Sequence, residues 1–311
     1  MGEQVGNDDP IKALFDGVIP ERVAEIMTLL SQHTAQFRAV EDSDGFDLKA
    51  GGFGAIQYTP RSMRQLWLFG YGGMLSLHSY ASFIAILRAL GQEFRISEID
   101  AIPGQVEIDR EFSELMAKIE ELKSAFGEAD FVWPENIPDP QDGRPPDVES
   151  AAVYDLTCIA VTYAFLHELK HIIFQSEGNA PADNREEEHE CDAFAQEIIL
   201  GRISTYCEQS GFPEAKVKMK RAMGIALASV FLLFATPRHL VGGSQTHPPV
   251  HGRWRSVVDG VDLNEDCYFW LYFSSMAISM LRFKRITMPQ MGFSSYRHLS
   301  HELIQALENG I

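Results

Sequence analysis

The chain has 311 residues, of which 45% are hydrophobic and 23% are charged, a composition typical of a globular protein with a sizeable core. Its formal net charge is -18. A surface of that sign repels phosphate groups, which argues against nonspecific binding to DNA, RNA or anionic lipid unless a local basic patch intervenes. The nearest approach to such a patch is residues 216–221, and we expect no nucleic-acid partner.

Four cysteines, Cys158, Cys191, Cys207 and Cys267, lie far apart in the sequence and form no CxxC pair. This usage favours a reducing compartment over secretion. The first ten residues lack the basic and apolar regions of a signal peptide, and Gly6 stands where a myristoylation signal requires Ser or Thr. We therefore expect a cytoplasmic location.

A membrane-spanning helix has to be considered for residues 66–87, a stretch of 22 residues without a formal charge. The stretch is interrupted by small and polar residues, including glycines at positions 70, 72 and 73. Hydropathy of this kind favours a buried helix, or a helix pair broken at the glycines, over a span. The apolar runs 223–236 and 267–281 are too short to span and indicate core helices. We expect no membrane partner.

Strand signals are scarce and helical periodicity is frequent, so we predict a mainly α fold with at most a small β element. In chain order, helices are expected over 21–40, with Pro20 at the start, over 62–90 and over 106–125. The glycine-rich segment 45–60 predicts a loop with one short strand at 55–58.

Residues 133–147 contain five prolines separated by Asp, Asn and Gly, and such a segment continues neither a helix nor a central strand. We place the domain boundary there, between an N-terminal helical part, 1–147, and a second part, 148–311, although one continuous domain is also compatible with the sequence. Asn184 and Glu187 indicate an N-cap and its capping partner at the start of a helix. Helices in the second part are expected over 148–175, 185–209, 214–236, 264–286 and 294–309.

The helix expected over 148–175 carries no charge between Asp155 and Glu168, which indicates a position in the middle of the fold. Near its end lies the pattern HExxH, formed by His167, Glu168 and His171. Two histidines four residues apart share one helical face and can bind one metal ion, while the glutamate between them can act as a general base. The alternative is two structural histidines in a helical domain without catalysis. It leaves Glu168 as an unpaired charge in the core, which is unfavourable.

A catalytic zinc site needs three protein ligands, and the segment 186–195 offers the third. At about 100° per residue, Glu188 lies on the apolar stripe of its helix, whereas neighbouring acidic residues point away or lie near the edge of the stripe. Asp192 follows one turn later and is well placed to accept the second N–H of a ligating imidazole. Cys191 shares the stripe and is an alternative ligand, since thiolate binds zinc well. His189 lies to the side and is a weaker alternative.

The combination of HExxH with a later Glu188-xx-Cys191-Asp192 resembles the HExxH and ExxAD signature of gluzincin peptidases, which include HtpX-like and CAAX-processing proteases. A His-Pro-Pro and Arg element that accompanies the signature has its counterpart in His247 and Arg253. Cys191 stands where Ala is usual, which keeps the thiol in question. The resemblance implies Zn²⁺ as the cofactor and a zincin-like helical fold whose catalytic part is 148–311. The site residues that it implies are the ligands His167, His171 and Glu188, the base Glu168, Asp192 behind the ligands, and His247 with Arg253 near the reacting atoms.

Two soluble families are also similar, the Lit-like phage-exclusion peptidases and the ImmA-type regulatory peptidases. The Lit-like family agrees better in length and in the placement of the motif past the middle of the chain. This resemblance implies a zinc-dependent endopeptidase with a protein or peptide substrate. In the Lit-like case, that substrate is a cytoplasmic host protein, a translation factor, cleaved in antiphage defence. His247 or Arg253 would stabilise the oxyanion. Two alternatives stay open, a catalytically silent zinc-containing regulatory protein and a membrane-associated protease of the CAAX or HtpX type.

Overall fold

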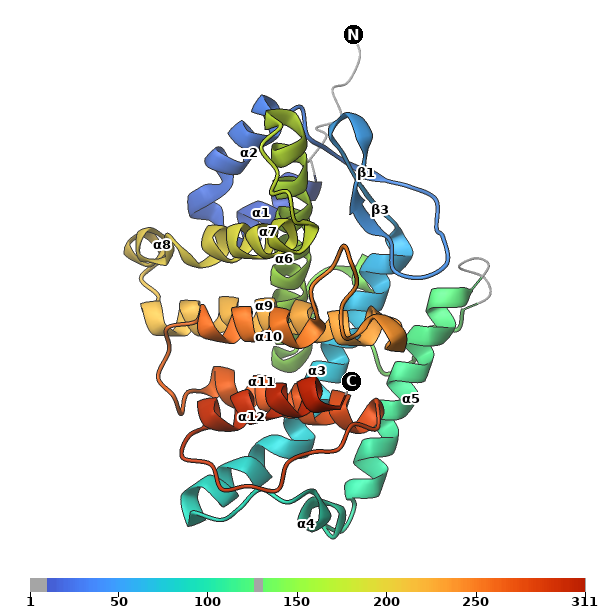
Figure 1. Ribbon diagram of the computed structural model, residues 1–311, viewed down its shortest axis with the longest axis vertical. Coiled ribbons are helices and arrows are strands. Elements are labelled where there is room, and N and C mark those ends of the chain that lie inside the picture. The colour runs from blue at the N-terminus through green and yellow to red at the C-terminus, as the bar shows by residue number, and fades with distance from the viewer. Residues whose placement is uncertain (1–9, 126–130, 311) are drawn as a thin grey trace.

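The computed structural model describes residues 10–125 and 131–310. Over these residues the protein is mainly helical with one small sheet, as the sequence predicts (Figure 1). The α-helices are α1 (Pro10–Val18), α2 (Val23–Gln32), α3 (Pro60–Leu90), α4 (Ile96–Asp100), α5 (Gln105–Ser124), α6 (Val148–Glu177), α7 (Asn184–Leu200), α8 (Ile203–Ser210), α9 (Glu214–Ala235), α10 (Val250–Asp259), α11 (Tyr268–Phe283) and α12 (Tyr296–Asn309).

Helix α6 lies in the middle of the fold, and α3, α7 and α9 pack on it. It begins after Asp147, whose side chain accepts a hydrogen bond from the backbone N–H of Ser150, and it ends at Gly178 in the left-handed conformation. Helix α9 approaches α6 closely at Gly224, where a Cβ atom would lie 2.4 Å from the Cβ of Ile159. The charge-free part of α6 is therefore enclosed by other helices, as its composition predicts.

Helix α3 is one continuous helix and not a pair broken at its glycines. A Cβ atom at Gly70 would lie 2.9 Å from Val153 of α6, and one at Gly73 would lie 2.7 Å from the hydroxyl of Tyr272 in α11. The glycines thus allow neighbouring helices to approach α3 closely. By length and composition alone, α3 and α6 could each cross a membrane. Inside the fold, 28% of the most apolar stretch of α3 and 50% of that of α6 are buried.

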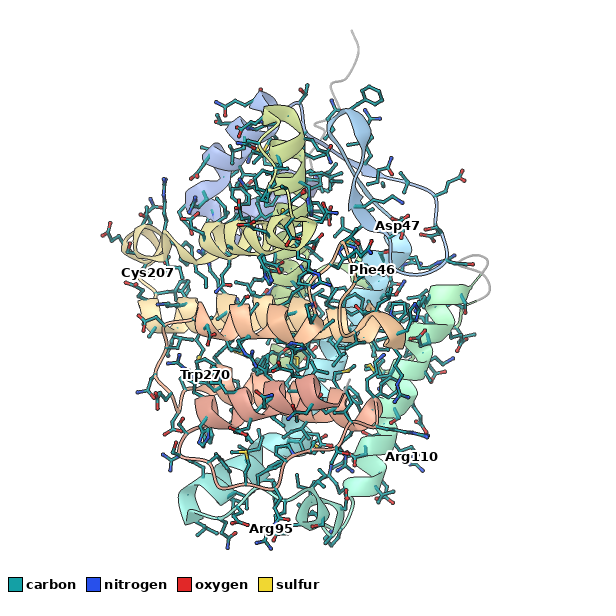
Figure 2. The ribbon with its side chains drawn as sticks, viewed as in Figure 1. Phe46, Asp47, Arg95, Arg110, Cys207 and Trp270 are labelled. Carbon is teal, nitrogen blue, oxygen red and sulfur yellow. The ribbon has the colours of Figure 1, made fainter. Side chains whose placement is uncertain are left out.

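The remaining helices form layers across these two. In Figure 1, α7, then α9 with α10, then α11 with α12 cross the view in succession, and α5 runs along one side. Helix α11 packs on both α3 and α9. Trp270 of α11, labelled in Figure 2, is fully buried in the lower layers. Elements from both sides of residue 147 therefore pack on one another, and the division into 1–147 and 148–311 stays a prediction.

A three-stranded sheet packs on the C-terminal half of α6. The strands are β1 (Gln36–Ala39), β2 (Leu48–Ala50) and β3 (Ala55–Tyr58), in the order β1-β3-β2, with β1 parallel and β2 antiparallel to β3. The rings of Phe37 and Tyr58 lie 4.7 and 5.3 Å from that of Phe165 in α6. The strand expected at 55–58 is confirmed, and aromatic packing fixes the sheet beside the HExxH pattern.

Several predicted boundaries are wrong. The helix expected over 21–40 ends at Gln32, because Thr34 adopts a left-handed conformation with φ 54° and residues 36–39 pair with β3 instead. The helix expected over 185–209 is interrupted at Gly201 and forms α7 and α8. Asp183 caps α7 in place of Asn184. At residues 33–34 and 201–202 a local turn outweighs the helical periodicity of the flanking residues.

Helix α10 was not predicted, and α11 is shorter than the helix expected over 264–286. Helix α10 begins directly after Pro249, at the end of a segment rich in Gly and Pro. Before α11, the N–H of Cys267 donates to the carbonyl of Asn264 at 3.0 Å, so these residues form a turn. Turn residues in both segments obscured the helix starts in the sequence.

We expect Gly224→Ala to lower the free energy of unfolding by about 1–3 kcal/mol, because the added methyl group has no space between α9 and Ile159 of α6. The matched control is Gly17→Ala in α1, where a Cβ atom meets nothing within 4 Å. This control should be neutral or stabilising by up to about 1 kcal/mol. Urea-induced unfolding measures both values. Equal stability of the two variants would contradict the close packing of α9 on α6.

Candidate functional site

The two histidines of the HExxH pattern direct their Nε2 atoms at a common position. His167 and His171 lie one turn apart on α6, and these two atoms are 3.2 Å apart. The other nitrogen of each ring is held by a carboxylate. His167 Nδ1 donates to Asp192 Oδ1 at 2.9 Å, and His171 Nδ1 donates to Glu187 Oε1 at 2.7 Å. These bonds fix the orientation of both rings and leave the Nε2 atoms facing a shared point.

Glu188 reaches the same point from α7. Its Oε2 is 3.4 Å from His167 Nε2, and its Oε1 is 3.5 Å from His171 Nε2. The residue is 7% exposed, which confirms its predicted place on the buried stripe of the helix. Burial works to raise the pKa of Glu188, but hydrogen bonds from His167, His171 and His247 outweigh it and hold that pKa well below its usual range. An anion therefore lies where the two imidazoles meet.

The distances among these three groups are close to those between the ligands of a tetrahedral metal ion. Zinc binds imidazole nitrogen at about 2.0–2.1 Å and carboxylate oxygen at about 2.0–2.2 Å, so neighbouring ligands in a tetrahedron are about 3.3–3.5 Å apart. The two Nε2 atoms are 3.2 Å apart; that of His167 lies 3.4 Å from Oε2 of Glu188, and that of His171 lies 3.5 Å from Oε1. His167, His171 and Glu188 can therefore hold one such ion and leave a fourth position open.

Cys191 gives a second donor set. Its Sγ and the two imidazole donors lie within 4.8 Å of one another, so His167, His171 and Cys191 could also hold a metal ion. The thiol is fully buried, and burial raises its pKa to about 12. A thiol must lose its proton to become a ligand, whereas the Glu188 carboxylate is already ionised. The two sets share both histidines and differ in the third donor.

The buried carboxylate of Asp192 joins three helices. Besides the bond to His167, it accepts a hydrogen bond at 2.9 Å from the hydroxyl of Tyr163 on α6. Arg253 of α10 donates to its two oxygens at 2.7 and 2.5 Å. Burial works to raise the pKa of Asp192, but Arg253 and His167 hold it well below its usual range. This bidentate pair, together with the bond from Tyr163, keeps His167 in one orientation.

Helix α10 brings Arg253 to the site because its apolar face packs on α9. Trp254 is fully buried, and its Nε1 donates to the carbonyl of Ser229 on α9 at 2.8 Å. Arg253 Nη1 lies 3.4 Å from Glu188 Oε2. Burial works to lower the pKa of Arg253, but Asp192 outweighs it and raises that pKa above its usual range. A permanent cation thus contacts both inward-facing carboxylates of α7.

Glu168 turns toward the sheet. Its Oε2 accepts a hydrogen bond at 2.6 Å from the backbone N–H of Ala50, in the edge strand β2. Burial raises the pKa of Glu168, and the nearby imidazoles of His167 and His171 work in the opposite direction. A carboxylate held in this way, with a raised pKa and next to the two histidines, is suited to take up a proton.

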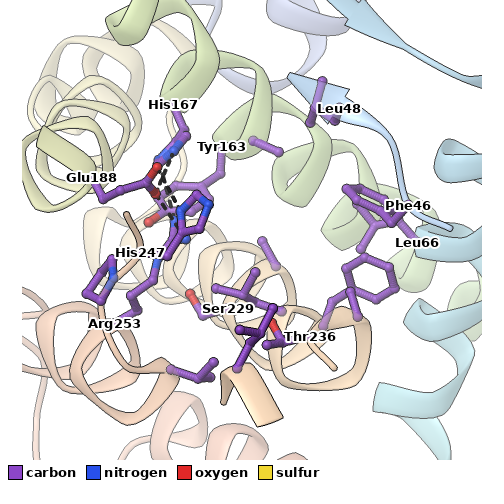
Figure 3. A pocket seen from close by; sticks show the side chains of 18 of the residues that line it. Phe46, Leu48, Leu66, Tyr163, His167, Glu188, Ser229, Thr236, His247 and Arg253 are labelled. Carbon is purple, nitrogen blue, oxygen red and sulfur yellow. Dashed lines mark hydrogen bonds and ion pairs between the residues drawn. The ribbon is translucent and has the colours of Figure 1, made fainter. Parts of the chain in front are cut away.

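A cavity of 530 Å³ opens beside these groups. Figure 3 shows His167, Glu188 and His247 together on one side of it and Phe46 with Leu66 on the other. His247 lies at the rim with 64% of its side chain exposed, and its Nδ1 is 3.1 Å from Glu188 Oε1. Much of the wall is apolar and includes Leu48, Ala228, Phe231, Leu232 and Val250. The cavity can therefore hold an apolar group directly beside the charged cluster.

Three partners of the site were not predicted from the sequence. Tyr163 precedes His167 by four residues, so the helical repeat could have identified it. Glu187 was expected near the edge of the stripe, and it bonds His171 from there. Ala50 acts through its backbone N–H, which leaves no pattern in the sequence.

The fold and the site define a mainly helical protein with a buried cluster, around an HExxH helix, that can hold a metal ion. Residues 56–273, which include the whole cluster apart from Ala50, match the Peptidase U49 family. This match covers more than half of the chain, and the protein belongs to the Peptidase U49 family. The cell death peptidase of Escherichia coli (strain K12) is 27% identical over 121 residues, which are 39% of this chain and 38% of that protein. The match thus spans less than half of that relative. No solved structure matches the chain.

These similarities bear on part of what the sequence predicts. The family supports the prediction of a peptidase, and together with the cell death peptidase it supports the resemblance to Lit-like peptidases. Neither of them names a metal, a gluzincin or a protein of the HtpX, CAAX or ImmA type. Zinc dependence, the roles of the individual site residues and the substrate therefore stay predictions.

We expect the effects of Asp192→Ala and Arg253→Ala on the free energy of unfolding to be non-additive. Each single change leaves a buried charge without its partner and should lower the free energy of unfolding by about 3–5 kcal/mol. The loss in the double variant should be smaller than the sum of the two by at least about 1 kcal/mol. The exposed pair of Lys12 and Asp16 on α1 is the control, with a coupling below about 1 kcal/mol. Urea unfolding of the variants gives both couplings. Additivity at Asp192 and Arg253 within about 0.5 kcal/mol would contradict their direct pairing.

Proposed function

We propose that the protein is a zinc-dependent endopeptidase in which His167, His171 and Glu188 are the metal ligands. The observation that carries this proposal is the set of separations among two Nε2 atoms and one carboxylate, 3.2, 3.4 and 3.5 Å. These values are close to the distance of about 3.3–3.5 Å between neighbouring ligands in a tetrahedral zinc site, although the two imidazoles lie beside different oxygens of Glu188. Membership of the Peptidase U49 family supports peptide-bond hydrolysis. Glu188 is preferred to Cys191 because its oxygens already lie at this distance from both imidazoles.

A zinc ion in this site would supply Lewis acidity at the scissile carbonyl and lower the pKa of water towards ~7. Glu168 is the general base, which takes a proton from the attacking water and passes it to the leaving amine. The hydrogen bond from Ala50 holds one oxygen of Glu168 at 2.6 Å. The carboxylate is thus fixed before substrate arrives, and its other oxygen carries the proton.

His247 and Arg253 are the groups proposed to stabilise the oxyanion. His247 is the better placed to touch substrate, because it lies exposed at the rim of the cavity and 3.1 Å from Glu188. Arg253 has two nitrogens engaged by Asp192. It therefore acts mainly as a positioning residue and contributes its positive charge to the site.

The proposed substrate is a protein of the cell in which the enzyme resides. The similar protein of Escherichia coli is named a cell death peptidase. For the present chain we infer a defence or regulatory protease whose cleavage of a host protein harms the cell. A cytoplasmic location is proposed because all four cysteines are free. The apolar wall of the 530 Å³ cavity supports an apolar side chain of the substrate beside the cleaved bond.

Glu168→Gln should abolish hydrolysis while zinc stays bound. The amide keeps the shape of the side chain and an oxygen for the N–H of Ala50, but it cannot accept the proton, so a loss of about 10²–10⁴-fold in rate is expected. The measurement compares new protein termini by mass spectrometry in bacteria that express the wild type or the variant. Termini found with the wild type alone support the proposal. Identical sets in both cultures would contradict the assigned base or the peptidase activity.

Metal analysis of the purified proteins is the control for this experiment. About one zinc per chain is expected in the wild type, in Glu168→Gln and in Cys191→Ala, whereas Glu188→Ala should lose zinc because one of three ligands is removed. Release of zinc by Cys191→Ala but not by Glu188→Ala would make Cys191 the third ligand. A wild type that holds zinc and produces no new termini would identify a silent zinc-containing regulatory protein instead.

A further inference from the structure

A second cavity, of 860 Å³, lies on the face of α6 opposite to the candidate site. Phe165, Cys158 and Tyr154 line it, and on a helix these positions are about 140–180° away from His167. Helix α1 and the beginning of α9 form much of the remaining wall, and residues of β3, α3 and α8 also contribute. The apolar part of the lining includes Ile11, Leu14, Tyr58, Val161, Phe165 and Val217.

The charged residues that line this cavity are mostly cationic, although the chain as a whole is acidic. The chain as a whole has 44 acidic and 26 Lys or Arg residues, whereas this lining contains four cations and one carboxylate. These are Arg144, Lys216, Lys220, Arg221 and Asp155. Positive charge is therefore gathered at this cavity in a protein that is strongly negative elsewhere.

Part of this positive charge has no internal partner. Arg221 forms a buried ion pair with Glu21 and is neutralised. Arg144 and Lys220 share one carboxylate, that of Asp155, at 2.9 and 2.8 Å, and their side chains are 56% and 51% exposed. Lys216 is exposed and forms no ion pair with residues 10–125 or 131–310. The mouth of the cavity is thus positive by about two charges, which suits an anionic group.

We propose that this cavity binds one single-chain anionic amphiphile. Its alkyl chain lies against the apolar walls formed by α1 and α6, and its carboxylate or phosphate headgroup lies at Arg144, Lys216 and Lys220. The volume falls within the range of about 300–1,000 Å³ that small-molecule sites occupy, and such sites combine apolar walls with a few charged groups. A long-chain fatty acid and a lysophospholipid share this chemistry.

A ligand in this cavity would be connected to the candidate site through α6 and the sheet. Phe165 precedes His167 by two residues, and the ring of Tyr58 in β3 packs on the ring of Phe165. Strand β3 pairs with β2, which holds Glu168 through Ala50. A bound chain would therefore contact α6, which carries the HExxH residues, and β3, which pairs with the strand that holds Glu168, without touching the HExxH residues.

The test is a titration of the full chain with cis-parinarate, an 18-carbon fatty acid whose fluorescence rises in an apolar site. Saturable binding of one parinarate per chain is expected. Oleate, lysophosphatidate and oleyl alcohol are then added as competitors, all below their aggregation concentrations. Oleate and lysophosphatidate distinguish the carboxylate from the phosphate source. The uncharged alcohol should compete at least about tenfold less well than the better of the two.

Two variants locate the site. Gly17 lines the cavity and a Cβ atom there meets nothing within 4 Å, so Gly17→Phe should fill the cavity and weaken binding at least about tenfold. Gly292→Phe, at another exposed glycine with open space, is its control. Lys216→Glu with Lys220→Glu should weaken binding about tenfold, which corresponds to about 1.4 kcal/mol. Arg110→Glu with Lys118→Glu on α5 is the control of equal charge change.

Binding that is lost in both test variants, and kept in both controls, would support the proposal. Circular dichroism and the melting temperature show whether each variant is folded. If Gly17→Phe does not fold, the double variant Lys216→Glu with Lys220→Glu still tests the site. Absence of saturable binding, equal competition by the alcohol, or equal affinity in the folded test variants and their controls would overturn it.

Discussion

The arrangement of the site depends on one buried carboxylate, that of Asp192. A buried anion is strongly unfavourable unless it is paired and hydrogen-bonded. Tyr163 and His167 of α6 and Arg253 of α10 meet this requirement together. They can do so only when α6, α7 and α10 are in their native positions, so the packing of three helices and the orientation of His167 are specified by the same contacts.

The same contacts make the site attractive to a cation. Burial lowers the pKa of both histidines, but hydrogen bonds to Asp192 and Glu188 outweigh it at His167, and those to Glu188 and Glu187 outweigh it at His171. The pKa is raised to about 9 in each. An environment that favours a proton at Nε2 also favours a metal ion there. The chain has a net charge of -18, and at this site its acidic residues stabilise positive charge on the histidines. The charged residues that line the cavity on the far face of α6 are instead mainly cationic.

The local part of the site could be predicted from the sequence, and the long-range part could not. The HExxH spacing puts His167 and His171 on one face, and apolar periodicity separates Glu188 from its acidic neighbours. The contact of Glu168 with Ala50 joins residues 118 apart through a backbone N–H, for which no sequence signal exists. Residues 36–39 likewise become a strand because β3 pairs with them, and tertiary context outweighs the helical pattern. The short helix α10 is hidden by the turn residues before it.

The central claim is that two imidazoles and one carboxylate bind zinc near the end of α6. X-ray absorption spectroscopy at the zinc edge tests this claim most directly. The zinc-loaded protein should show only nitrogen and oxygen neighbours, at about 2.0–2.2 Å. A sulfur neighbour at about 2.3 Å would contradict the claim, since it would assign Cys191 as a ligand.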